Sequence, residues 1–160
     1  DPGTIATLAS EGAVVGVKDS SGAGELLAQL NVLCEQGEIP LLRFLGTIFR
    51  ITSTVGVGVD GVIPGIGNLV PNACARGWEA GVAGDAETVR ECNALLMAAT
   101  KISSVARGGG ANAASFGGMK SALKIMGVLD HDNVSRPMRP LTDDEKLEIP
   151  AILKELGLQD

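Results

Sequence analysis

Aromatic, histidine and basic side chains are scarce in this sequence. Its 160 residues include no tyrosine, one tryptophan, three phenylalanines and one histidine, and the formal net charge is −6. A nucleic-acid surface needs a basic patch and rings for stacking, so we expect no nucleic-acid partner. A Ser-His-Asp triad or a multi-histidine metal site is hard to assemble around His131 alone, and we predict no metal and no cofactor.

Long apolar runs and paired cysteines are also lacking. The sequence shows no secretory signal and no run of 18 apolar residues, so we expect neither export nor a membrane span. Cys34, Cys74 and Cys92 are odd in number and have no metal-ligand spacing. We interpret them as reduced, buried thiols, and we predict a cytoplasmic protein.

The composition is that of a globular protein, with 45% apolar and 20% charged residues. Its hydrophobic patterns first alternate between strand and helix and then become helical only. An N-terminal helix is predicted from Asp1 to Gly12, followed by strands at 13–17, 39–45 and 59–63 that alternate with helices at 24–36 and 47–57. Further helices are predicted at 72–82, 85–105, 113–126 and 142–156, the last with a capping box and an interruption near Pro150.

Lys18 ends the first predicted strand, a short run of small and β-branched apolar residues at 13–17. Such a run suits a parallel strand, and α/β proteins keep their sites at the carboxyl ends of parallel strands. An amine among apolar neighbours loses hydration, which favours the free base that attacks a carbonyl carbon. Lys18 is therefore a candidate for imine chemistry, although a lysine in this position can also end a strand in solvent.

A glycine-rich segment offers a second interpretation. Residues 56–61, with the sequence GVGVDG, match the spacing of the dinucleotide-binding fingerprint. That fingerprint needs a strand before it and a helix after it, whereas a helix is predicted before these residues and a strand after them. A dinucleotide-binding domain is therefore an unfavoured alternative.

Three motifs, in order along the chain, carry a resemblance to a known family. They are residues 13–22 (AVVGVKDSSG), residues 61–71 (GVIPGIGNLVP), and residues 120–127 with 136–141 (KSALKIMG and RPMRPL). Their order and spacing resemble the dihydrodipicolinate synthase and N-acetylneuraminate lyase family, pyruvate-handling class I aldolases built on a (β/α)8 barrel. The resemblance covers nearly the whole chain.

The resemblance implies an α/β fold that forms the C-terminal part of a (β/α)8 TIM barrel, because a complete barrel needs roughly 250 residues. Residues 1–71 would supply about three βα units, and residues 72–160 a barrel-covering helix and a C-terminal helical domain. In the family, the lysine that matches Lys18 forms an imine with pyruvate. The resemblance therefore implies a pyruvate-dependent class I aldolase or lyase that joins or separates a 2-oxo acid and an aldehyde.

The resemblance also implies substrate-binding positions. Gly46 and Thr47 follow a predicted strand and are expected to line the cavity that Lys18 faces, and Ile63 matches a family residue beside the imine. Many relatives have acidic, substrate-binding residues after the glycine, where this sequence has Thr47 and Ile48. This departure favours short 2-oxo acids or a semialdehyde over polyhydroxylated sugar acids.

Part of the family's site has no counterpart in this sequence. The proton-transferring tyrosine and the hydroxyl-rich carboxylate-binding loop belong to the N-terminal half of the family's barrel. We therefore expect the missing half of the barrel as a partner, and a homo-oligomer, either dimer or tetramer. Without that half, two sheet edges and one face would lack cover, and we place Val15, Val17, Leu42 and Val62 on this face. A non-catalytic half-barrel that assembles through its strand edges is the alternative.

Overall fold

The computed structural model describes residues 1–21, 24–48 and 50–159. Its contacts divide the chain into two compact units. The first comprises Asp1–Gly67 and Asn72–Asn93, and the second comprises Asn68–Pro71 and Ala94–Asp160. Gly22 of the first motif, and Phe49 of the predicted 47–57 helix, lie outside the described residues.

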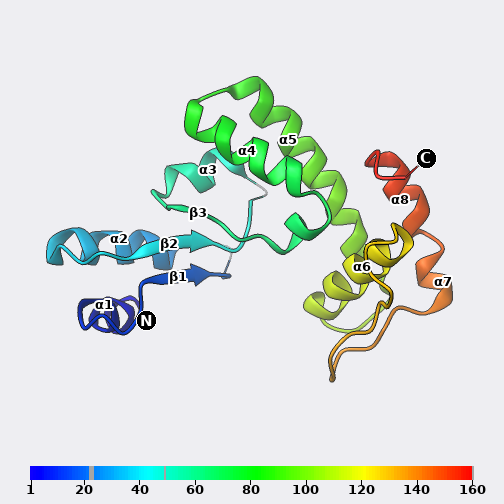
Figure 1. Ribbon diagram of the computed structural model, residues 1–160, viewed down its shortest axis with the longest axis horizontal. Helices are drawn as coiled ribbons and strands as arrows, with labels where there is room; N and C mark the ends of the chain where they lie inside the picture. The colour runs from blue at the N-terminus through cyan, green and yellow to red at the C-terminus, as the bar shows by residue number, and fades with distance from the viewer. Residues whose placement is uncertain (22–23, 49, 160) are drawn as a thin grey trace. The chain divides into compact units, whose positions relative to one another are not determined.

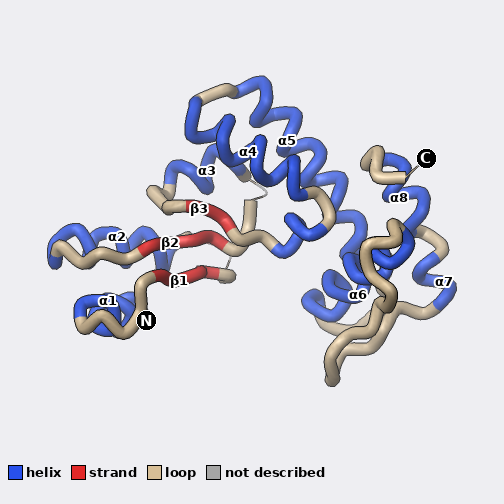
Figure 2. Tube along the Cα trace, in the orientation of Figure 1, coloured by secondary structure: helices blue, strands red, loops and turns tan. Residues whose placement is uncertain are grey.

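A parallel sheet lies at the centre of the first unit (Figures 1 and 2). Its strands are β1 (Gly16–Asp19), β2 (Leu42–Leu45) and β3 (Gly61–Val62), in the order β1-β2-β3. Lys18 pairs with Phe44, and Phe44 pairs with Gly61. The three predicted strands are confirmed, but β1 begins later than predicted, so Lys18 lies inside the strand and Asp19 ends it.

Helices alternate with these strands and then continue alone. In the first unit they are α1 (Pro2–Ser10), α2 (Glu25–Gly37), α3 (Ile51–Gly56), α4 (Pro71–Ala83) and the start of α5 (Ala86–Ala99). Asp1 caps α1 by accepting a hydrogen bond from the Thr4 amide at 3.0 Å. A short 3-10 helix, η1 (Gly65–Asn68), follows β3 and was not predicted.

One face of the sheet packs against α1 and α2. The core consists of Ala6, Ala9, Leu27, Leu30, Cys34, Leu41 and Leu45, with Val17 and Val62 among the residues packed against it. The prediction that Val17 and Val62 lie on the uncovered face is therefore wrong. Successive side chains of a strand point to opposite faces, so Val17 and Lys18 cannot share one.

The opposite face carries Lys18, Leu42, Phe44 and Ile63, and we call it the open face. Leu42 is 51% exposed and Ile63 is 49% exposed, although both are large apolar residues. Lys18 is exposed and Phe44 is half-buried. The sheet therefore has one face buried by helices and one largely apolar face exposed around a single amine.

The second unit is helical. It contains the end of α5, the 3-10 helix η2 (Thr100–Ser104), α6 (Ala111–Ile125), α7 (Asp143–Lys146) and α8 (Ile149–Glu155). The helix predicted at 85–105 therefore ends in a 3-10 segment, and the helix predicted at 142–156 is divided into two, with Pro150 in the first turn of α8. Within the described residues, no helix is both long enough and apolar enough to cross a membrane.

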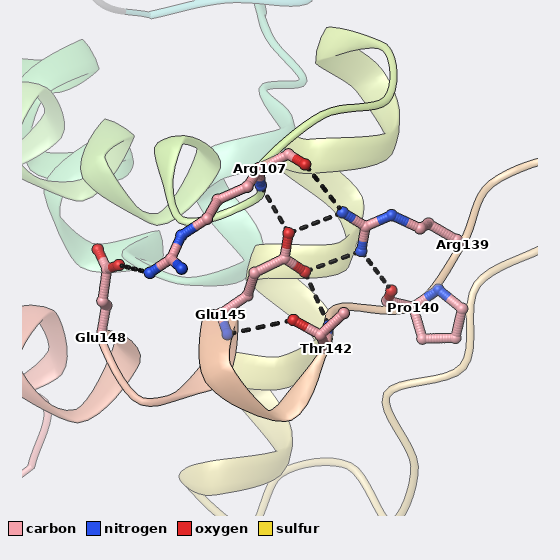
Figure 3. Close-up of polar contacts among 6 residues, drawn as sticks. All are labelled: Arg107, Arg139, Pro140, Thr142, Glu145 and Glu148. Carbon is pink, nitrogen blue, oxygen red and sulfur yellow. Dashed lines mark hydrogen bonds and ion pairs between the residues drawn. The ribbon is translucent and has the colours of Figure 1, made fainter.

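Glu145 joins three segments of the second unit (Figure 3). Its carboxylate accepts hydrogen bonds from both terminal nitrogens of Arg139, at 2.7 and 2.8 Å, from the Arg107 amide at 2.6 Å and from the Thr142 amide at 2.7 Å. Thr142 and Glu145 form the predicted capping box. These donors, Arg139 foremost, hold the pKa of Glu145 well below its usual range.

Asp132 forms a second ionic cluster, which includes residues of the third motif. Its carboxylate accepts hydrogen bonds from Lys146 at 2.7 Å, Ser121 at 2.9 Å and Lys124 at 3.2 Å. The hydrogen bond from Lys146, followed by those from Ser121 and Lys124, holds the pKa of Asp132 well below its usual range. Neighbouring His131, which sequence analysis singled out, is exposed.

Helix α6 approaches η2 closely at Gly118. A Cβ atom built on Gly118 would lie 2.0 Å from the carbonyl oxygen of Ile102. A Cβ atom on the preceding residue, Gly117, would lie 3.5 Å from the Leu141 side chain, at ordinary van der Waals distance. The packing of α6 against the backbone of η2 therefore requires a glycine at 118 but not at 117.

Gly118→Ala should destabilise the second unit, because the new methyl group cannot fit without separating α6 from η2. We expect a loss of about 1–3 kcal/mol or more. Hydrogen exchange of the α6 amides measures the loss as reduced protection. Gly117→Ala is the matched control, and it should leave protection unchanged or raise it, since alanine favours helix by about 1 kcal/mol. Equal effects of the two substitutions would contradict the close approach at Gly118.

Acid should weaken the same unit. A carboxylate whose pKa is lower in the folded than in the unfolded chain contributes stability above its unfolded pKa of about 4, and that contribution is lost as the pH falls. Protection of α6, corrected for the intrinsic exchange rate, should therefore decline below about pH 5. Asp132→Asn should weaken the unit at pH 7 and flatten this decline. An unchanged acid dependence in that variant would refute the assignment to Asp132.

Candidate functional site

The Lys18 side chain stands on the open face of the sheet, one residue before the carboxyl end of β1. The apolar side chains Leu42, Phe44 and Ile63 belong to the same face. In the described ranges, no group of three or more histidine, cysteine, aspartate or glutamate residues could hold a metal ion. Of the four side chains that define the open face, Lys18 alone ends in an amine, and the other three are apolar.

Asp19 points to the other side of the sheet and is buried. One carboxylate oxygen, Oδ1, accepts a hydrogen bond from the Ser21 amide at 2.8 Å, which turns the chain just after the lysine. The other oxygen, Oδ2, has no hydrogen-bond partner among residues 1–21, 24–48 and 50–159. Asp19 thus anchors the turn beside Lys18 from the covered face.

Gly46 lies directly beside Lys18 at the end of β2. Its amide donates a hydrogen bond to the carbonyl oxygen of Asp19 at 2.7 Å. A Cβ atom built on Gly46 would lie 2.7 Å from Ser20 Oγ and 3.1 Å from Lys18 Cε. The absence of a side chain at Gly46 therefore gives the lysine chain its space across the end of β2.

The other predicted site residues lie near the same edge. The Ile63 amide donates to the carbonyl oxygen of Leu45 at 2.8 Å, which extends the pairing of β3 past its last strand residue. Thr47 directly follows Gly46 and is half-buried, whereas Ile48 is fully buried. Of these two residues, only Thr47 has any surface available to a ligand.

The cysteines are poor candidates for a nucleophile. Cys34, Cys74 and Cys92 are free thiols, and all three are buried. Burial raises the pKa of the Cys74 thiol to about 11, and the neighbouring Cys92 adds to the effect. A protonated thiol is a weak nucleophile, so Cys74 is poorly suited to attack a substrate.

The glycine-rich segment at 56–61 has the wrong surroundings for a dinucleotide. Gly56 ends α3 and Gly61 begins β3, so a helix precedes the segment and a strand follows it. Gly58 has a φ of +77°, which a turn out of a helix requires. A strand, and not a helix N-terminus, directly follows these glycines, so they lack the surroundings that a pyrophosphate needs.

Known proteins resemble the chain along nearly all its length. The Dihydrodipicolinate synthetase family model matches residues 1–156. The 4-hydroxy-tetrahydrodipicolinate synthases of Geobacter sulfurreducens and Trichlorobacter lovleyi are 32% and 30% identical to it, each over 98% of this chain and 50% of its own length. The chain thus spans about half the length of the curated relatives it matches.

Solved structures also match nearly all of this chain over about half of their own length. A dihydrodipicolinate synthase from Bacteroides thetaiotaomicron aligns with a TM-score of 0.84 and 24% identity, over 96% of this chain and 50% of its own. One from Thermotoga maritima aligns with a TM-score of 0.76 and 24% identity, over 98% of this chain and 51% of its own. The likeness shows that the α/β fold described above corresponds to half of a dihydrodipicolinate synthase TIM barrel.

Three observations point to the same family. They are the order of the three motifs, the position of Lys18 in a parallel sheet and the match of the family model over residues 1–156. This chain belongs to the dihydrodipicolinate synthetase family.

Proposed function

We propose that the chain is the C-terminal half of a pyruvate-dependent class I aldolase or lyase. The observation that carries the proposal is the Lys18 amine on the open, apolar face of the sheet, with Gly46 leaving room for its side chain. The named activity of the relatives, 4-hydroxy-tetrahydrodipicolinate synthase, supports the class of reaction.

In the proposed reaction, Nζ of Lys18 attacks the keto carbon of pyruvate, and loss of water leaves an imine. The protonated imine withdraws electrons from the adjacent methyl carbon, which gives up a proton and attacks an aldehyde carbon. The aldehyde oxygen takes up a proton, and water then releases the product and restores the amine.

The sequence has no tyrosine, so the family's proton-transferring tyrosine must come from outside it. The strand order leaves one edge of β1 and one edge of β3 unpaired within the described sheet. These edges and the open face are where we place the N-terminal half of the barrel. One solved relative, YagE from Escherichia coli, contains pyruvate, which supports a 2-oxo acid as the ligand of the completed site.

The burial of Ile48 and the lack of a carboxylate at Thr47 and Ile48 support a short substrate. Ile48 is fully buried and Thr47 is half-buried, so the turn after Gly46 presents no carboxylate to sugar hydroxyl groups. We therefore favour short 2-oxo acids and a small aldehyde or semialdehyde. We also propose a cytoplasmic homo-oligomer, and the three buried free thiols support a reducing compartment.

A non-catalytic half-barrel is the second candidate, and the unpaired strand edges favour it. Such a protein would assemble through β1 and β3 but would have no use for an amine on the open face. Trapping of an imine separates the two candidates, because a scaffold need not react with a 2-oxo acid.

Pyruvate and borohydride should together label Lys18 in the assembled barrel. We define this preparation as the chain co-eluting with the N-terminal half of the Geobacter sulfurreducens relative. Peptide mapping by mass spectrometry should find the reduced pyruvate adduct on Lys18, because borohydride converts the imine to a stable amine. Lys18→Ala should abolish the adduct, and Gly46→Ala should reduce it, since its methyl group displaces Lys18 Cε.

Lys154, an exposed lysine of α8, provides the matched control. Lys154→Ala should leave the labelling unchanged. Labelling that persists in Lys18→Ala would show that the nucleophile is wrongly assigned. A co-eluting assembly that traps no pyruvate at all would favour the non-catalytic half-barrel.

A further inference from the structure

The ring of Phe44 crosses the open face of the sheet. Phe44 pairs with Lys18 on one side and with Gly61 on the other. A Cβ atom built on Gly61 would lie 3.3 Å from ring atoms Cδ1 and Cε1, and one built on Gly16 would lie 3.7 Å from Cε2. One edge of the ring therefore lies over β3 and the other approaches β1, above two positions that have no side chain.

These two glycines fix the height of the ring along the strands. Gly16 precedes Lys18 by two residues, and Gly61 precedes Ile63 by two residues, so each pair shares a face of the sheet. On β1 the ring approaches Gly16 and on β3 it covers Gly61, so it forms a layer closer to the amino ends of these two strands than Lys18 and Ile63. Side chains in a barrel interior fill it in such layers, and this layer lies beneath the amine.

A floor at this depth restricts what the amine can bind. In the proposed reaction the aldehyde arrives from the carboxyl ends of the strands, where Gly46 lies beside the lysine. The attacking carbon is planar, so it turns one face to this aldehyde and the opposite face to the ring, and a further substituent on it takes up space in the plane above the ring. A methyl group needs less of this space than an ethyl group.

We propose that Phe44 is a specificity-determining residue whose ring forms the floor of the 2-oxo acid pocket and selects pyruvate over longer 2-oxo acids. The proposal rests on the proposed function and names the residue that sets its substrate size. Gly16 and Gly61 support the floor, because a side chain at either position would contact or displace the ring.

The test compares the trapping of pyruvate and 2-oxobutyrate at Lys18 in the assembled barrel, each with borohydride and at equal concentration. The wild-type chain should prefer pyruvate. Phe44→Leu should still trap pyruvate but should lower the preference by about tenfold or more, the usual effect of one methylene in a tight pocket. Phe116→Leu is the matched control, because Phe116 lies on α6 and is 44% exposed, and it should keep the wild-type ratio.

An unchanged ratio in Phe44→Leu would overturn the proposal. If that variant traps neither acid, Phe44→Met, which is closer in volume, decides: restored pyruvate trapping with a lowered preference supports the floor, whereas a wild-type ratio or no trapping overturns it. Failure of the wild-type barrel to trap pyruvate is a separate result, and it counts against the proposed function.

Discussion

The unequal covering of the sheet's two faces is the constraint on which the structure of the first unit depends. Helices α1 and α2 pack on the face that carries Val17, Leu45 and Val62, and period-two alternation then places Lys18, Phe44 and Ile63 on the opposite face. Large apolar side chains on this face remain about half exposed. At about 25 cal/mol per Å2 of apolar area, burying them would contribute several kcal/mol. The place of Lys18 on the open face and the exposure of its apolar neighbours are therefore two consequences of the same alternation.

Two glycines and two ionic clusters position neighbouring segments of the chain. Gly46 makes room for the Lys18 chain, and Gly118 lets α6 approach η2 backbone to backbone. In the second unit, buried Glu145 and Asp132 each collect several donors from separate segments. Residues of the third motif belong to these clusters, which gives that motif a structural role within the helical unit.

Sequence patterns predicted the strand and helix order, the position of Lys18 near a carboxyl end and the capping box at Thr142. They did not predict which face of the sheet the helices cover. Val17 and Val62 were assigned to the wrong face because an apolar run does not show which side is covered. The burial of Ile48, Asp19 and Asp132 was missed for a related reason, since each depends on contacts with distant residues. The place of Phe44 on the same face as Lys18 could have been predicted by counting two residues back from Gly46 along the strand.

We propose that this chain presents a half-barrel whose open face needs the other half. Light scattering combined with thermal melting of the chain, alone and after addition of the N-terminal half, tests it most directly. Alone, the chain should self-associate or melt without cooperativity, and the added half should yield one discrete species with a higher melting temperature. A monodisperse monomer with a sharp, cooperative melt, unchanged by the added half, would contradict the account.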